Sequence, residues 1–400
     1  MNIVFDRSPD IDQTQFKILC QNLQSRNQGW LNIEILEQQL AAIHDFAAKN
    51  LGTYTDIVVL GIGGSMLGPK MLRDVIGIKN DLIVHCLDNI DPWIISQLDA
   101  ALPYATTLFL VQTKSGGTPE TIAQYEFFRS KVEMHRLAIV DHFVFVTDPE
   151  VGHLRHVATA ENITSFEIPQ NIGGRFSVFT PIGLVIAALM GQNIEQYIQG
   201  AQIALQNQVQ TAYCLALWQV SQSQKNVVCM PYSSRLSTFS QWYVQLLSES
   251  IGKRVDRNGA VVHAGLTPIP AIGATDQHSG LQLFAEGPDD KQFLFVTVGD
   301  HQAAPRIPAL DTVDFKYLSE IAFETLLHAE FLGTRDSLTE AHRPIATLEI
   351  EKIDEKNLAQ LCVFLELTIA FIGEILNINA FDQPGVERSK QLTREHLLKK

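Results

Sequence analysis

Hydroxyl side chains and glycines are concentrated in one stretch of the sequence, Leu108–Gln124 (LFLVQTKSGGTPETIAQ). An apolar segment leads into three hydroxyls and one ammonium group, those of Thr113, Ser115, Thr118 and Lys114. A proline then begins a predicted helix, whose N-terminal N–H groups and dipole would attract an anion, so we predict a phosphate site. The alternative is an ordinary turn, because Ser, Thr and Gly are common there. No Walker pattern is present, which favours the phosphate of a small metabolite over that of ATP.

A second glycine-rich stretch, Gly61–Pro69 (GIGGSMLGP), follows the short apolar segment Ile57–Leu60. A dinucleotide-binding fingerprint would need glycine at position 66, and this position is Met66. We therefore prefer a close approach of the backbone to a small ligand, with Ser65 as a hydrogen-bond donor, over a nicotinamide site. A tight turn between strand and helix is the structural alternative.

Four ionisable residues lie in contexts that could support acid–base chemistry. Arg175 lies between glycines and a mostly apolar segment, where a buried charge needs a partner or a ligand. Glu249 lies near the end of a predicted amphipathic helix with Lys253 at i+4, so a surface ion pair and a functional carboxylate are equally compatible with the pattern. His278 follows a turn at a predicted helix start, and Lys390 lies in a predicted C-terminal helix. By pattern alone, neither is distinctive.

Composition restricts the partners of the chain. Thirty basic and 44 acidic residues give a net charge of −14, and no basic stripe is interleaved with aromatic residues. This composition disfavours a protein that binds nucleic-acid backbones, and we predict no nucleic-acid partner. It also means that a phosphate substrate must be attracted locally, by helix ends and a few placed cations.

The cysteines and apolar stretches predict a cytoplasmic protein with no membrane segment. The five cysteines are scattered without a CxxC pair, which is typical of reduced thiols without disulfides or zinc. The N-terminus lacks the pattern of an export signal. The longest apolar stretches, Val178–Met190 and Cys362–Leu376, are too short or too polar to span a bilayer, and we predict them to be core helices.

The order of predicted elements indicates an α/β fold with parallel sheets flanked by helices. We divide the chain into a helical N-terminal arm (1–50, with a helix over Leu31–Lys49), a first domain (51–200) and a second domain with C-terminal helices (201–400). The predicted strands are Ile57–Leu60, Leu82–Leu87, Thr107–Val111, Phe143–Val146, Asn226–Met230 and Phe293–Val298. Long helices are predicted over Asp314–Leu332 and Glu355–Leu376. Ligands bind at the carboxyl ends of parallel strands, so both glycine-rich loops should lie on one edge of the first sheet.

Taken together, the motifs resemble those of the phosphoglucose isomerase family. The matching segments are GIGGSMLGP, TKSGGTPET, GGRFSVFTPIGL, SESIGK, GATDQHS and QPGVERSK, in the family's order from residue 61 to 390. The resemblance implies two sugar-isomerase (SIS) domains and a homodimer with the active site near the subunit interface. It implies reversible conversion of glucose 6-phosphate and fructose 6-phosphate, a step of glycolysis and gluconeogenesis, with no metal or organic cofactor.

The resemblance also implies a role for each matching residue. Glu249 would move a proton between C2 and C1, and Arg175 would stabilise the enediolate. His278, reaching across from the partner subunit, would aid ring opening, and Lys390 would act at the ring oxygen. The residues implied to bind the substrate are Gly64, Ser65, Thr113, Lys114, Ser115, Thr118 and Gln383. For Lys114 the alternative is a side chain that points to the sheet rather than to the phosphate. At the position of Thr113 the family usually has serine, so the hydroxyl is kept and a methyl group is added.

Two other functions remain open from the sequence. A non-catalytic SIS module would bind a sugar phosphate without an acid–base set, and the joint presence of Glu249, His278 and Lys390 argues against it. An isomerase of broader specificity could also accept mannose 6-phosphate.

Overall fold

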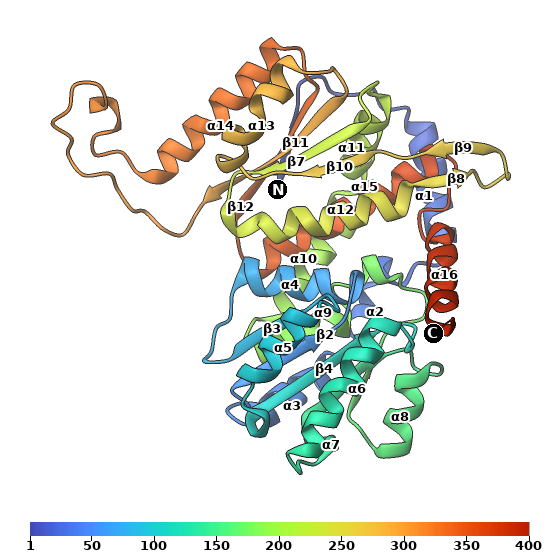
Figure 1. Ribbon diagram of the computed structural model, residues 1–400. Coiled ribbons are helices and arrows are strands. Elements are labelled where there is room, and N and C mark those ends of the chain that lie inside the picture. Colours follow the sequence, from blue (N-terminus) through green and yellow to red (C-terminus); the bar gives the residue numbers. More distant parts are fainter. Residues whose placement is uncertain (400) are drawn as a thin grey trace.

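The computed structural model describes residues 1–399 and contains two five-stranded sheets, which Figure 1 shows one above the other. The first sheet has the order β3-β2-β4-β5-β6, and every neighbouring pair is parallel. Its strands are β2 (Asp56–Leu60), β3 (Ile83–Leu87), β4 (Thr107–Thr113), β5 (Phe143–Thr147) and β6 (Ser165–Glu167). The predicted α/β fold with parallel sheets is therefore confirmed.

The central strands of the first sheet are buried and mostly apolar because helices cover both of their faces. All residues of β2 and β4 are buried. Alternate residues enter separate cores: Ile57 and Leu108 lie in one, and Val58 and Phe109 in the other. The helices of this half are α3 (Leu40–Asn50), α4 (Gly64–Ile76), α5 (Pro92–Ala101), α6 (Pro119–Met134), α7 (Ile139–His142), α8 (His153–Glu161) and α9 (Pro181–Leu189). Such strands favour a parallel sheet over an antiparallel one.

The second sheet has the order β1-β12-β11-β7-β10, and only β1 runs antiparallel to its neighbour. Its strands are β1 (Asn2–Phe5), β7 (Asn226–Pro231), β10 (Thr267–Pro270), β11 (Lys291–Asp300) and β12 (Ile345–Lys352). The helices that follow α9 are α10 (Ile194–Asn207), α11 (Val209–Ser221), α12 (Ser237–Ile251), α13 (Thr275–Glu286), α14 (Phe323–Glu340) and α15 (Glu355–Ile375). A small hairpin, β8 (Lys253–Val255) and β9 (Val261–Ala264), projects beyond α12, and the chain ends in α16 (Glu387–Leu398).

The two faces of the second sheet carry different helices, which matters for the site. Residues Val227 and Leu294 of one face share a core with Leu246 of α12. Residues of the other face, such as Val228, pack with Phe284 of α13 and with α14. Helices α12 and α13 therefore lie on opposite sides of the sheet, and α12 is the one that contacts α4 of the first half (Figure 1).

Helix α15 is the central core helix of the molecule. It is long and apolar enough to cross a membrane by composition, but 94% of its most apolar window is buried inside the protein. It packs against α1 (Gln13–Ser25), α10, α11 and α12. The predictions that Cys362–Leu376 and Val178–Met190 are core segments are confirmed, since α9 and α15 are almost wholly buried.

Three details of the predicted elements were wrong. The first 50 residues are not only helical, because β1 adds to the far edge of the second sheet, a pairing across more than 300 residues that local pattern cannot reveal. The helix predicted over Leu31–Lys49 is divided by a turn into α2 (Ile33–Glu37) and α3. The helix predicted from Asp314 begins at Phe323, because the apolar residues before it lie on an exposed loop and have no core to face.

Candidate active site

Both glycine-rich loops lie at the carboxyl edge of the first sheet, as predicted. Strands β2 and β4 are parallel neighbours, with Leu60 opposite Val111 at the ends from which the loops leave. The backbone of the first loop runs close to β4: a Cβ atom on Gly61 would lie 3.2 Å from the carbonyl oxygen of Gln112. The two loops therefore form one surface.

The hydroxyl loop folds into a compact cluster ahead of helix α6. The Thr113 hydroxyl lies 2.7 Å from that of Thr118 and 3.3 Å from that of Ser115, and the last two lie 3.3 Å apart. The backbone N–H of Gly117 donates to the Ser115 hydroxyl over 3.4 Å. Thr118 is the N-cap residue of α6, so the hydroxyls and the unpaired N–H groups of a 16-residue helix meet at one point. This arrangement suits a phosphate.

The lysine of this loop does not point into the cluster. The Lys114 ammonium donates to the backbone carbonyl of Gln170 over 2.9 Å. Burial lowers the pKa of Lys114, against the attraction of the Asp148 carboxylate. The expected direct contact between Lys114 and the phosphate is therefore not preformed, because the ammonium already has a backbone acceptor on the segment after β6.

The first glycine-rich loop lies against the segment that carries the buried arginine. A Cβ atom on Gly64 would lie 2.3 Å from the carbonyl carbon and oxygen of Gly174. Gly63 has a positive φ of 57°, and a Cβ there would lie 3.0 Å from the side-chain nitrogen of Gln245. Only glycine permits this approach. Ser65 follows Gly64 in the first turn of α4, at the carboxyl end of β2.

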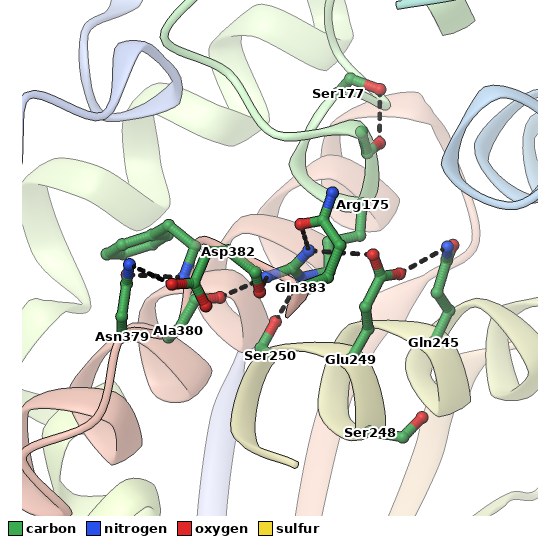
Figure 2. A network of polar contacts seen from close by, with 12 residues as sticks. Arg175, Ser177, Gln245, Ser248, Glu249, Ser250, Asn379, Ala380, Asp382 and Gln383 are labelled. Atoms are coloured by element: carbon green, nitrogen blue, oxygen red, sulfur yellow. Dashed lines mark hydrogen bonds and ion pairs between the residues drawn. The ribbon is translucent and has the colours of Figure 1, made fainter. Parts of the chain in front are cut away.

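Arg175 is the centre of the polar network in Figure 2. Its side chain is 1% exposed and donates to the Ser250 hydroxyl at 2.7 Å, the Glu249 carboxylate at 3.1 Å and the Gln383 amide oxygen at 3.2 Å. It also donates to the backbone carbonyls of Ala380 and Asp382. Burial lowers the pKa of Arg175, and the nearby carboxylates oppose this shift. The buried charge is therefore fully partnered, as the sequence required.

Glu249 faces Arg175 from the last turn of α12. One carboxylate oxygen accepts from Arg175, and the other accepts from the side-chain nitrogen of Gln245 at 2.8 Å (Figure 2). The side chain is 25% exposed, so solvent or a ligand can reach it. Gln245 was missed by sequence reasoning, although its spacing of four residues from Glu249 on a predicted helix could have indicated it.

Lys253 does not form the ion pair with Glu249 that the i+4 spacing allowed. Its ammonium donates instead to the backbone carbonyl of Glu249 at 2.7 Å and to that of Asp382 at 2.9 Å. Its side chain is 6% exposed. Burial, together with the nearby Arg175 charge, lowers the pKa of Lys253 to about 8.

A buried carboxylate anchors the segment Asn377–Gln383, which supplies three of the acceptors around Arg175. Glu374, at the end of α15, has a side chain that is 1% exposed. Its carboxylate accepts hydrogen bonds from two side-chain nitrogens of each of two arginines. Arg26 donates at 2.9 and 3.0 Å, and Arg257 donates to both oxygens as well as from its backbone N–H to the carbonyl of Asn377. None of these contacts was foreseen, because they join three segments distant in sequence.

Two of the predicted acid–base residues lie apart from this network. His278 is exposed on α13, on the opposite side of the second sheet from α12 and Glu249. Lys390 is exposed on α16, where its ammonium pairs with Glu387 at 2.7 Å. The structure therefore brings together Arg175, Glu249 and Gln383, and leaves His278 and Lys390 on the surface of the chain.

The assembled residues suit proton transfer beside a developing oxyanion. A carboxylate with a solvent-accessible side can accept and return a proton, and a fixed guanidinium beside it can stabilise negative charge. Across residues 1–399, no group of three or more His, Cys, Asp or Glu side chains has the arrangement of a metal site.

Comparison with known proteins gives consistent matches. The family model described as phosphoglucose isomerase matches residues 35–303 and 328–399. The glucose-6-phosphate isomerase of Carboxydothermus hydrogenoformans is 37% identical over 391 residues, covering 91% of this chain and 84% of that protein. That of Thermus thermophilus is 35% identical over 380 residues, covering 92% of this chain and 90% of the relative.

Solved structures show the same likeness. A hypothetical protein from Thermus thermophilus superposes with a TM-score of 0.89 at 33% identity, covering 96% of this chain and 95% of the other. A glucose-6-phosphate isomerase from Chlamydia trachomatis superposes with a TM-score of 0.77 at 24% identity, covering 98% and 76%. The tagatose-6-phosphate ketose/aldose isomerase from Escherichia coli, at 14% identity and a TM-score of 0.57, shares the fold.

Proposed function

The chain belongs to the phosphoglucose isomerase family and catalyses the reversible isomerisation of glucose 6-phosphate and fructose 6-phosphate, and from this premise we propose how its residues divide the reaction. The isomerisation moves one proton between C2 and C1 of the open-chain sugar and passes through an enediolate. It needs a base next to C1 and C2, positive charge next to the enediolate oxygens and a site that binds the phosphate.

Glu249 is the base in this proposal. The supporting observation is the position of its carboxylate, which is held by Arg175 and Gln245 and still has a 25% exposed side chain. Such a carboxylate can take the proton from C2 of the aldose and return it to C1 without moving. Positioned acid–base catalysis of this kind is worth about 100- to 10,000-fold in rate.

Arg175 stabilises the enediolate. Its guanidinium is already fixed by Ser250 and by two backbone carbonyls, and its other donors are engaged by Glu249 and Gln383, so it acts through its positive charge and needs little reorganisation when charge develops on the substrate oxygens. Gln383, whose amide oxygen accepts from Arg175, is exposed and would contact the sugar. Removal of one such fixed donor from an oxyanion site typically costs about 100- to 1,000-fold in kcat.

The hydroxyl cluster at the N-terminus of α6 holds the phosphate. Its support is the convergence of the hydroxyls of Thr113, Ser115 and Thr118 at the end of a helix. Gly64 and Ser65 would lie beside the phosphate, and Lys114 would act through its positive charge rather than by direct contact. In a chain of net charge −14, these groups provide the local attraction for an anionic substrate.

His278 and Lys390 act at the sugar ring, and the working unit is a homodimer in which His278 is contributed across the interface. Two observations support the dimer. His278 lies on the far side of its own second sheet from Glu249. The loop between β11 and α14, which extends away from the rest of the chain in Figure 1, exposes Val313 by 88% and Tyr317 by 71%. Exposed apolar side chains on an extended loop are typical of a surface that a second subunit covers.

The cytoplasm is the proposed compartment. All five cysteines are unpaired, and burial raises the pKa of Cys86 to about 11 and that of Cys229 to about 12. Unreactive thiols without disulfides are typical of proteins in a reducing compartment.

Replacement of Glu249 by glutamine tests the assignment of the base. We expect Glu249→Gln to lower kcat by about 100- to 10,000-fold and to abolish exchange of solvent hydrogen into C2, because the amide cannot accept the proton. Activity is measured by a coupled assay for glucose 6-phosphate, and exchange by NMR in deuterated water. Glu37→Gln, at an exposed position of α2, is the matched control. Undiminished exchange in Glu249→Gln would remove Glu249 from this role.

A further inference from the structure

Lys253 joins two parts of the site that are distant in sequence. It is the first residue of β8 and follows Gly252, the C-cap residue of α12, and its side chain is 6% exposed. Its ammonium donates to the backbone carbonyl of Glu249, at the end of α12, and to the backbone carbonyl of Asp382. The Asp382 carboxylate lies farther away, at 3.8 Å. The main partners of this buried cation are therefore backbone carbonyls, and the residue also caps the C-terminal end of a helix.

The two segments that Lys253 joins carry the base and the groups that fix the arginine. Helix α12 presents Glu249, and the segment Asn377–Gln383 presents the carbonyl of Asp382 and the amide of Gln383 to Arg175. The carbonyl of Asp382 accepts from both Arg175 and Lys253, at 3.1 and 2.9 Å. One oxygen atom thus links the two cations. By bridging the two carbonyls, Lys253 fixes the distance between the end of α12 and the segment Asn377–Gln383, which holds Arg175.

We infer that Lys253 is a positioning residue for the isomerisation, and that its protonated side chain holds Glu249 and Arg175 in their mutual arrangement. The inference rests on the proposed roles of those two residues. Lys253 itself does not touch the substrate in this account, because its hydrogen bonds are committed to backbone carbonyls on both sides. A displacement of about 1 Å in such a site can cost about 100-fold in rate.

The charged groups around Lys253 make this arrangement sensitive to alkaline pH. The ammonium faces Arg175 from the loop before α9, Glu249 from α12 and Asp382 from the segment after α15. Burial and then the Arg175 charge lower its pKa to about 8, while the two carboxylates oppose that shift. The ammonium and its charge-assisted hydrogen bonds are present below this pH, and above it the neutral amine makes only weaker hydrogen bonds to the same two carbonyls. The substrate phosphate, with a second pKa of about 6, is already a dianion throughout this range.

The pH dependence of kcat in three variants tests the inference. In the wild type we expect kcat to fall as pH rises through about 8, the pKa of Lys253. Lys253→Met should lower kcat by about 100-fold with KM changed by less than about 3-fold, and should lack this alkaline decline, because a displaced base affects turnover more than binding. Lys253→Arg keeps a positive charge at all these pH values and should move the alkaline decline upward. Arg254→Met, at the adjacent exposed position, is the control and should match the wild type.

The inference is overturned if Lys253→Met keeps the wild-type kcat, or if Lys253→Arg and the wild type share one alkaline decline. Thermal melting of each variant identifies a folding defect, and if Lys253→Met does not fold, the pH profile of Lys253→Arg decides. Failure of Glu249 as the base would appear separately, as undiminished C2 exchange in Glu249→Gln, without any change in the alkaline behaviour of the Lys253 variants.

Discussion

The residues proposed to act on the sugar form two groups. Hydrogen bonds within one chain fix the side chains of the first group but do not bring the second group to the site. The inner group, Arg175, Glu249 and Gln383, is joined by direct hydrogen bonds around a side chain only 1% exposed. The outer group, His278 and Lys390, lies exposed on two helices. A buried charge is costly unless every partner is present, so the inner group is fixed by the fold. The side chains of the outer group are exposed and need no buried partners, so their arrangement in the site depends on the proposed second subunit.

The difference suggests which steps of the reaction need a prebuilt environment. Proton transfer at C2 depends on a base and an oxyanion site whose positions are fixed before the substrate arrives. Ring opening needs only a donor and an acceptor near the ring, which a second subunit and a terminal helix can supply. We expect substitutions in the inner group to lower activity strongly. The contribution of the outer group should be measurable only in the assembled dimer.

The largest effect should come from hybrids of two inactive variants. Glu249→Gln and His278→Gln should each lose at least about 100-fold in kcat as pure proteins. If His278 acts across the interface, a purified hybrid dimer has one intact site and should recover about half of the wild-type kcat, because that site combines the intact Glu249 of the His278→Gln chain with the intact His278 of the Glu249→Gln chain. Differently tagged chains, co-expressed and separated, allow this measurement. A hybrid no more active than its parents would assign His278 to its own chain.

A smaller effect should follow from loss of the carboxylate that anchors the segment Asn377–Gln383. Glu374→Gln leaves Arg26 and Arg257 without their charged partner, and we expect the free energy of unfolding to fall by about 3 kcal/mol at neutral pH. Burial alone would raise the pKa of Glu374, but the hydrogen bonds from the two arginines outweigh it and lower the pKa.

The sign of that shift fixes the pH dependence of the Glu374 effect. A lowered pKa stabilises the folded state above the pKa of the unfolded chain, and this contribution is lost as pH falls through the pKa of the folded state. The difference between wild type and Glu374→Gln should therefore shrink in acid. Urea denaturation at several pH values measures it, with Glu351→Gln at an exposed position of β12 as the control. A difference independent of pH would contradict the account.

The smallest effect on stability should come from the outer group. The side chains of Lys390 and Glu387 are both 59% exposed, so their i,i+3 pair is worth no more than about 0.5 kcal/mol. Lys390→Met should lower isomerase activity while the urea midpoint stays within error of the wild type, and Glu387→Gln controls for the pair itself. A large loss of stability in Lys390→Met would show that this lysine is buried in the assembled enzyme.

The sequence was sufficient for features that depend on local pattern. Apolar strands alternating with helices predicted the parallel sheets, and the rule that ligands bind at strand carboxyl ends predicted that the two glycine-rich loops share one edge. It also required a partner for Arg175, since a charge beside Phe176 and Val178 cannot be buried alone. The identity of that partner was not derivable from pattern, because Glu249 lies 74 positions away in the chain.

What pattern could not predict depends on contacts between distant segments. Strand β1 is recognisable only from its pairing with β12. The orientation of Lys114 depends on the backbone of Gln170, and that of Lys253 on a carbonyl 129 positions later. Helical spacing alone would have paired Lys253 with the Glu249 carboxylate, but the fold gave its ammonium backbone acceptors instead. The domain boundaries at residues 50 and 200 and the individual roles of the site residues stay predictions.

The central position of α15 has a consequence for how the enzyme is made. Leu19 and Leu23 of α1 share one continuous core with residues of α15 and with the helices of the first half, so the two ends of the sequence meet in the same interior. During synthesis, α1 and the helices of the first half keep apolar surface exposed until α15 has also left the ribosome. Chaperone demand and losses to aggregation should therefore depend on translation speed late in the message, where α15 is encoded.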